Sequence, residues 1–526
     1  MDFLSVKRGA GRESGWRPVV VALALWAGLA GCQGRGGAEQ GGLGTRLAAG
    51  RVRALQASAD GTWLALLDGC VEVKGRFMPL GTAACDLKVL PTAGGEPRLV
   101  ARAVPSLPHG VLFAPEGGVL AALADYDFAS GSGTLVLVRD GVAREAARGV
   151  TFHGFVPGGG GAVLAVAGAK LWYGTPEGAI REVKGTEGVA SFELAQGGAD
   201  TTLAGLARRS TGAGGGLLAL APGFERASVL ASGTSEYGLA RRGDLFAYSV
   251  QVKAETTLWL GRGGKARPVG QGARFFSLSR GGEAVAWISE AAPGKQGDLQ
   301  LAPASGEPSR LAREVGELRW ASAAPRLAWL EQYDPRVRAG VLGVGGPGAA
   351  TRTFGKNVTD FELSADGERV AFLRHTVEGG YSVDLWAGDV AGSPRRIARG
   401  VFGFSFSPDG RWIYYRTRCT RNGDACDLER VAAGGAGDPG PEAIAQGVKS
   451  FEFDPRDPGR LLITWQRADL VALDFGIWRA GKLVQVDRGA LPGSIRFLGP
   501  DSRRVSFVVA QEKRAGIYVA ALPVPE

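Results

Sequence analysis

The chain has 526 residues, of which 45% are hydrophobic and 84 are glycine, and its formal net charge is +9. Glycine is about twice as frequent as its usual share of roughly 7% but follows no collagen-like period, so the composition predicts a globular chain with many turns. The basic residues form no long run and accompany no nucleic-acid-binding motif, which argues against nucleic acid as a partner.

Residues 1–31 have the order of an export signal. Four basic residues between Lys7 and Arg17 precede an apolar stretch that is shorter than the roughly 20 residues of a membrane-spanning helix. The stretch ends in Leu-Ala-Gly-Cys at residues 29–32, which resembles the lipobox of bacterial lipoproteins. The resemblance implies cleavage before Cys32 and attachment of lipid to it. The alternative is an uncleaved anchor with an incidental cysteine.

Residues 32–44 contain six glycines and no apolar pattern, which predicts a flexible tether with a reach of about 20 Å. The residue after the acylated cysteine influences sorting in bacterial lipoproteins. By that resemblance, Gln33 favours delivery to the outer membrane, with the protein facing the periplasm.

From residue 45 onward the sequence is built from repeats. Each repeat has an apolar strand, a Ser-x-Asp-Gly-like turn and a second strand, and the clearest turns end at Gly61, Gly367 and Gly410. Asp and Ser can bond to their own backbone and Gly accepts a positive φ, so this pattern favours tight hairpins. Eleven such turns recur at a mean spacing of about 44 residues, the length of a four-stranded propeller blade. We therefore predict an all-β fold, a β-propeller of about eleven four-stranded blades.

Eleven blades exceed the usual four to eight of one ring, so the pattern favours two tandem propellers. We expect them over residues 45–272 and 273–526, with the boundary between 270 and 316. The last repeat ends after its third strand, near residues 517–521, and residues 45–48 have the pattern of a fourth strand. We expect the N-terminal strand to complete that last blade.

The run Phe-Ser-Phe-Ser-Pro-Asp-Gly-Arg at residues 404–411 resembles the blade motif of TolB-type propellers, also called WD-like repeats. The resemblance extends over nearly all of residues 44–526. It implies a non-catalytic scaffold that binds other envelope proteins. Related proteins act in Tol-Pal-like systems, in outer-membrane assembly, or in secretion and motility machinery such as gliding motility.

Four cysteines remain besides Cys32. Cys70 ends a second strand and Cys85 begins the next one, and Cys419 and Cys426 occupy the same places in a later repeat. The matching places predict the disulfides Cys70–Cys85 and Cys419–Cys426, which would fit an oxidising periplasm. Buried free thiols or a metal site are the alternatives, but the second pair has the wrong spacing for zinc and no histidine lies nearby in the sequence.

Catalytic motifs are scarce. The chain has only three histidines, no Gly-x-Ser-x-Gly nucleophile elbow and no glycine-rich phosphate loop with its lysine. We therefore predict that the protein is not an enzyme and binds no metal or cofactor. The main alternatives are a periplasmic propeller enzyme, such as a lactonase, glycan hydrolase or sugar dehydrogenase, and a surface adhesin.

A series of polar residues recurs at the second position of the inner-strand motifs, where the neighbouring residues are apolar. Because inner strands surround the channel of a propeller, we expect these side chains to line a tunnel that binds a peptide, a sugar or an ion. Ordinary hydrogen bonding between blades is the alternative. The charged members of the series are Glu193, Arg319, Glu362, Glu452 and Arg496.

Overall fold

The computed structural model describes residues 44–522 except 51, 75–80, 179, 197–201, 211–214, 242–244, 254, 290–295, 376–382, 421–422, 424, 435–439, 467–471, 510 and 512. The predicted signal peptide, Cys32 and the tether before residue 44 lie outside the described residues. The regular secondary structure in the described part of the chain consists of β-strands alone, which confirms the predicted all-β class. That part contains no helix long and apolar enough to cross a membrane.

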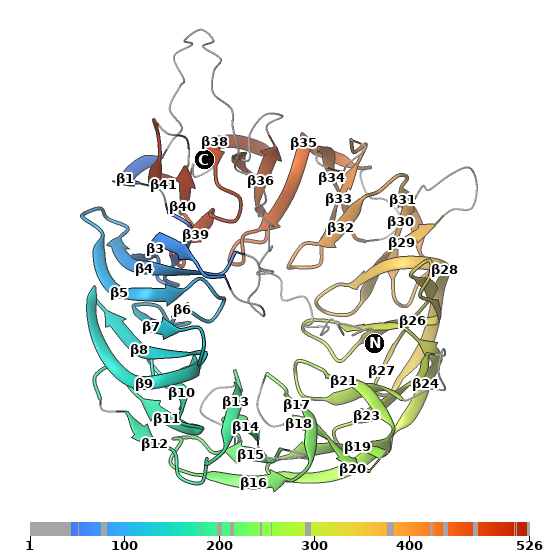
Figure 1. The fold of residues 1–526 in the computed structure, drawn as a ribbon. Helices are drawn as coiled ribbons and strands as arrows, with labels where there is room; N and C mark the ends of the chain where they lie inside the picture. The colour runs from blue at the N-terminus through green and yellow to red at the C-terminus, as the bar shows by residue number, and fades with distance from the viewer. Residues whose placement is uncertain are drawn as a thin grey trace. The chain divides into compact units, whose positions relative to one another are not determined.

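The repeated unit is a group of four antiparallel strands that follow one another in chain order. Four of the described sheets consist of one such group each, and Figure 1 shows their strands side by side. These sheets contain β2 (Ala54–Ala57), β3 (Trp63–Glu72), β4 (Ala83–Pro91) and β5 (Arg98–Pro105); β13 (Val189–Leu194), β14 (Gly205–Arg209), β15 (Leu217–Leu220) and β16 (Ala227–Ala231); β17 (Thr234–Leu239), β18 (Leu245–Val252), β19 (Glu255–Arg262) and β20 (Lys265–Gln271); and β21 (Ala273–Leu278), β22 (Ala284–Ser289), β23 (Gly297–Pro303) and β24 (Ser309–Val315). This is the strand order of a propeller blade.

Two seven-stranded sheets each combine two groups through one long shared strand. They contain β6 (Val111–Phe113), β7 (Val119–Asp127), β8 (Ser132–Arg139), β9 (Val142–Phe155), β10 (Val163–Ala167), β11 (Lys170–Gly174) and β12 (Arg181–Glu182); and β25 (Glu317–Trp320), β26 (Leu327–Asp334), β27 (Ala339–Gly346), β28 (Ala349–Leu363), β29 (Arg369–His375), β30 (Val383–Asp389) and β31 (Arg395–Ala398). The shared strands are β9 and β28. β28 pairs with β27 up to Val358 and with β29 from Val358 onward, so it ends one group and begins the next.

The remaining strands are β32 (Gly403–Phe406), β33 (Trp412–Thr417), β34 (Cys426–Ala432), β35 (Glu442–Phe453), β36 (Arg460–Gln466), β37 (Leu473–Arg479), β38 (Lys482–Ala490), β39 (Arg496–Leu498), β40 (Arg504–Val509), β41 (Gly516–Ala521) and β1 (Thr45–Ala49). β1 pairs antiparallel with β41, and Thr45 lies opposite Val519. This confirms the predicted pairing of the N-terminal strand with the last repeat. β1 covers an edge of β41 that would otherwise present unpaired backbone groups.

The described residues form two compact units. The central unit contains Phe192–Pro222 and Ser228–Gly459, and the terminal unit contains the residues up to Ser191, Gly223–Ala227 and the residues from Arg460 onward. The predicted propeller boundary after residue 272 falls between β20 and β21. A division into two propellers at this point stays a prediction.

The core of the central unit lies between successive sheets. On β29, Val370 and Phe372 pack toward the β25–β28 strands, whereas Ala371 and Leu373 pack with β32–β34. All four side chains are buried, with at most 7% exposed. Because successive side chains on a strand point to opposite faces, a sheet covered on both faces needs a continuous apolar run rather than an alternating pattern.

The Ser-x-Asp-Gly turn is held by side chain to backbone bonds. Ser364 Oγ donates to Asp366 Oδ1 at 2.5 Å, and Asp366 Oδ1 also accepts the backbone N–H of Glu368 at 3.0 Å. Gly367 has a φ of +71°, and a Cβ at this position would lie 2.6 Å from the Arg326 side chain. Glycine is therefore required here both by the backbone conformation and by the neighbouring Arg326 side chain.

Candidate functional site

The predicted channel residues all lie on first strands of their groups, as expected. Glu193 is on β13, Arg319 on β25, Glu362 on β28 and Glu452 on β35, while Arg496 is on β39. The first four belong to the central unit and Arg496 belongs to the terminal unit. Binding of a ligand by the whole series stays a prediction.

Arg319 joins the first strands of two successive groups. Its Nη1 donates to Asp360 Oδ1 at 2.7 Å and to the carbonyl of Phe361, and its Nε donates to Glu317 Oε1 at 3.0 Å. The guanidinium also lies over the Phe361 ring, 4.6 Å from its centroid. Burial lowers the pKa of Arg319, but the carboxylates of Asp360 and Glu317 more than offset this and hold the pKa above its ordinary value. These contacts match the alternative reading, hydrogen bonding between blades.

Glu362 makes a similar contact one group further along. Ser405 Oγ on β32 lies 3.5 Å from Glu362 Oε1 on β28 and donates to it. Glu452, by contrast, is exposed to solvent. In the terminal unit, Arg496 Nη1 donates to the neighbouring carbonyl of Ile495 at 2.7 Å. The polar series thus mixes side chains that connect strands with side chains that are exposed to solvent, Glu193 and Glu452.

Glu193 is a predicted channel residue whose pKa the surrounding protein changes strongly. Desolvation by the surrounding protein raises the pKa of Glu193 to about 7, and the backbone N–H of Leu239 opposes this by favouring the charged form. Solvent still reaches the side chain, which limits what the shift contributes to stability. A carboxyl group that titrates near neutrality can exchange protons with a bound ligand.

Potential metal ligands and a surface cavity are further candidate features of the described residues. No three His, Cys, Asp or Glu side chains converge as a metal site would require in this part of the chain. A surface cavity of about 260 Å³ lies on the terminal unit and is lined by Leu137, Arg144, Pro176 and Ile180, among others. It contains none of the predicted site residues.

A set of arginines missed by the sequence reasoning connects successive groups at their Ser-x-Asp-Gly turns. Arg369, the first residue of β29, donates from Nη1 to the carbonyl of Gly410 in the next turn at 3.0 Å. In the terminal unit, Arg460 donates in the same way to Ser502, and Arg504 Nη2 donates to Gly61 at 3.4 Å. The last contact joins residues 443 positions apart in the sequence. An arginine at the first position of the second strand was the available signal.

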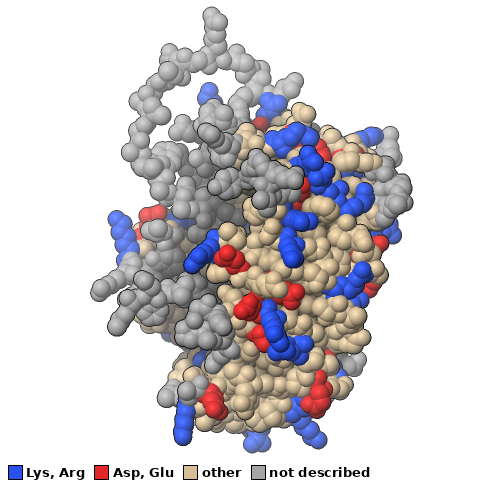
Figure 2. Space-filling model, turned by 90° about the vertical axis from the view of Figure 1, so that its right-hand side faces the viewer, with Lys and Arg blue, Asp and Glu red and all other residues tan. Residues whose placement is uncertain are grey.

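A second set of arginines connects the outer parts of successive groups. In each case an arginine on or near a fourth strand donates to a backbone carbonyl between the third and fourth strands of the next group. The pairs are Arg144 with Glu177, Arg181 with Phe224, Arg267 with Gly306, Arg352 with Val390 and Arg395 with Gly434. On the face shown in Figure 2, Lys and Arg side chains have acidic side chains among them rather than forming one basic block.

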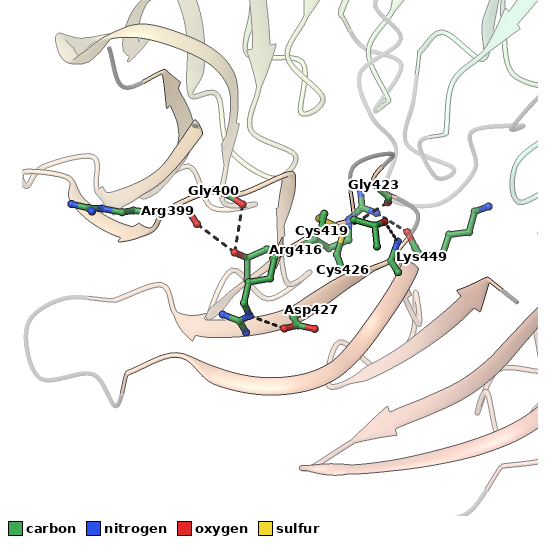
Figure 3. Close-up of a disulfide and its surroundings, with 12 residues drawn as sticks. Arg399, Gly400, Arg416, Cys419, Gly423, Cys426, Asp427 and Lys449 are labelled. Atoms are coloured by element: carbon green, nitrogen blue, oxygen red, sulfur yellow. Dashed lines mark hydrogen bonds and ion pairs between the residues drawn. A yellow bond between two sulfur atoms is a disulfide. The ribbon is translucent and has the colours of Figure 1, made fainter. Parts of the chain in front are cut away.

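Both predicted cysteine pairs lie at disulfide distance. Cys70 and Cys85 connect the ends of β3 and β4, and Cys419 and Cys426 close the hairpin between β33 and β34. Figure 3 shows the second pair beside the segment at Arg399 and Gly400. Each pair therefore closes a hairpin at the same position within its group. The predicted lipid attachment at Cys32 lies outside the described residues.

The chain matches no protein-family model, and a search among curated proteins also finds no match. Among solved structures, it is similar to a eukaryotic initiation factor, with a TM-score of 0.40 and 14% identity over 77% of this chain and 96% of that one. For the β-propeller domain of the Trilobed protease from Pyrococcus furiosus, the TM-score is 0.29 with 13% identity over 55% of this chain and 95% of that one. For TolB from Acinetobacter baumannii, the TM-score is 0.23 with 15% identity over 44% of this chain and 60% of that one. At these values, none of the likenesses carries an argument about function.

Proposed function

We propose that the protein is a lipid-anchored β-propeller of about eleven blades that acts as a non-catalytic scaffold for other proteins of a bacterial envelope. The observation that carries this proposal is the repeated four-strand group, connected to the next group by arginines at both its turn and its outer edge. Such an assembly presents rigid loops for binding at a low cost in conformational entropy. The two disulfide-distance cysteine pairs suit the oxidising compartment that the export signal predicts.

The position of β1 supports an orientation for the terminal unit. The tether joins β1 at Thr45, which pairs near the end of β41, whereas Ala49 pairs with Gly516 at the start of β41. Leu522, just after β41, bonds to Arg503 beside the Ser-x-Asp-Gly-like turn of the same group. With a tether reach of about 20 Å, the turns of the terminal unit would face the membrane and the Cys70–Cys85 hairpin would face away from it.

The proposal is tested by isolating the full chain from detergent-solubilised envelopes. We expect it to fractionate with membranes and to co-purify with other envelope proteins in constant ratio, and we expect Cys32→Ala to release it into the soluble periplasm. A chain that stays in the cytosol, or that purifies from the envelope alone, would contradict the scaffold. The partner classes for this test are Tol-Pal-like, outer-membrane assembly, and secretion or motility complexes.

The channel is tested in the same isolation. Joint replacement of Glu362 and Glu452 by alanine should abolish capture of a partner that binds the inner strands. The control is Val229→Ala, at an exposed position on β16, which should leave capture unchanged. Unchanged capture by a folded double variant would remove the channel as the binding site. The enzyme alternative predicts turnover of a lactone, glycan or sugar by the purified chain, and the absence of turnover would remove it.

A further inference from the structure

One end of the β32–β35 sheet exposes an aromatic ring. Phe402 directly precedes β32, and 56% of it is accessible to solvent. Its backbone N–H donates to the carbonyl of Arg416 on β33 at 2.8 Å, which fixes the residue to the sheet. Single exposed apolar residues are common on protein surfaces, so the exposure alone indicates nothing. The contacts around the ring are the informative feature.

The Phe402 ring is held between a cation and a closed hairpin. The guanidinium of Arg416 lies 5.3 Å from the ring centroid. On the hairpin, a Cβ on Gly423 would lie 2.5 Å from Phe402 Cζ, so the backbone of Gly423 lies directly against the ring. Gly423 belongs to the hairpin that Cys419 and Cys426 close (Figure 3). A ring held in this way loses little conformational freedom when a partner binds to it.

The positive charge of Arg416 forms no ion pair within the described part of the chain. Its Nη1 donates to the carbonyl of Lys449 at 2.6 Å, and the side chain is half-buried. Among the described residues, no carboxylate lies within ion-pair distance of Arg416, and the carboxylates of Asp427 and Glu429 are bound by Arg418. Burial lowers the pKa of Arg416. A carboxylate brought by a partner would restore the favourable contacts that the guanidinium lost on leaving water.

We infer that Phe402, Arg416 and Gly423 form a docking site for an acidic polypeptide segment. An apolar side chain of the segment would cover the Phe402 ring, and a neighbouring carboxylate would pair with Arg416. Rigid aromatic residues beside arginine are typical of the few residues that carry most of the affinity of a protein interface. A single ring fixed at the base of a hairpin fits such a protein contact better than insertion into lipid, which uses a broad apolar face. This inference rests on the proposed scaffold function.

The site is tested by placing the photo-crosslinking residue p-benzoylphenylalanine at position 402 of the full chain and irradiating intact envelopes. The matched position is Val229 on β16 of the same unit, of which 62% is exposed. We expect position 402, and not position 229, to crosslink to one protein segment, and mass spectrometry of the crosslinked peptide to show Asp or Glu next to an apolar residue. A crosslink to lipid, a segment without carboxylates, or equal yields at both positions would overturn the inference.

The contribution of Arg416 is tested in the same crosslinking assay. Arg416→Gln should reduce the yield at position 402 at least about tenfold. Arg416→Lys keeps the charge and should restore part of the yield. Arg310→Gln, which removes an exposed arginine of β24, should leave it unchanged. If envelope proteins co-purify with the full chain but position 402 crosslinks none of them, this site is wrong and the scaffold stands. If nothing co-purifies, the scaffold fails as well.

Discussion

The buried histidine of the terminal unit makes stability depend on pH in a predictable direction. His153 lies on β9 and is 1% exposed. Burial and the neighbouring His109 lower the pKa of His153 to about 4, against an opposing contribution from the backbone carbonyl of Ala121. In the unfolded chain a histidine titrates near 6.5. Between these two values the unfolded state binds more protons than the folded state, so the free energy of unfolding falls as the pH falls from 6.5 towards 4.

The two pKa values set the size of this effect. From pH 8 to pH 5, His153 alone is expected to cost about 2 kcal/mol of folding stability. His153→Leu replaces the ring by an apolar side chain of similar volume and should remove this loss. Urea unfolding of the full chain in detergent, followed at pH 8 and pH 5, measures the difference between wild type and variant. His109→Gln removes the like charge beside the ring and should reduce the loss by a smaller amount.

Two outcomes would refute this reasoning. One is an equal loss of stability between pH 8 and pH 5 in wild type and His153→Leu. The other is an NMR titration in the folded protein that places the pKa of His153 near 6.5, because a ring that titrates as in water is not desolvated.

Three further substitutions test the contacts that hold the groups together. Arg504→Met removes the hydrogen-bond donor to Gly61 and should lower the free energy of unfolding, measured by thermal unfolding, by about 1.5–3 kcal/mol. The side chain of Arg503 is exposed, so Arg503→Met should change this free energy little. Gly367→Ala places a side chain at a positive φ and against Arg326, so it should destabilise the protein by more than 1 kcal/mol. Gly434→Ala adds a methyl group in open space and should not destabilise it. Equal effects of the two substitutions would contradict the packing argument. Cys419→Ser should lower the free energy of unfolding by about 2–3 kcal/mol under oxidising conditions and leave it unchanged under reducing conditions.

The local features of the fold were predictable from the sequence because they depend on residues close together in the chain. The Ser-x-Asp-Gly turns are made by bonds that span two to five residues, as at Ser364 and Asp366. The strand positions follow from apolar runs between such turns. The partners of the cysteines followed from their equivalent places in two repeats, and the pairing of β1 with β41 followed from a repeat that lacked its fourth strand.

The use of the polar side chains was decided only by the tertiary structure. Arg319 and Glu362 were predicted to line a channel, and the structure shows that both also form hydrogen bonds to residues of the next group, 41 to 43 positions away in the sequence. Binding of a ligand by these side chains stays a prediction. Arg504 bonds to Gly61 at the other end of the chain. The sequence by itself determined an all-β chain of repeated hairpins, since hairpins form from neighbouring residues. Which side chains connect the sheets and which stay open to a partner depends on how separate sheets pack, and no local pattern specifies that packing.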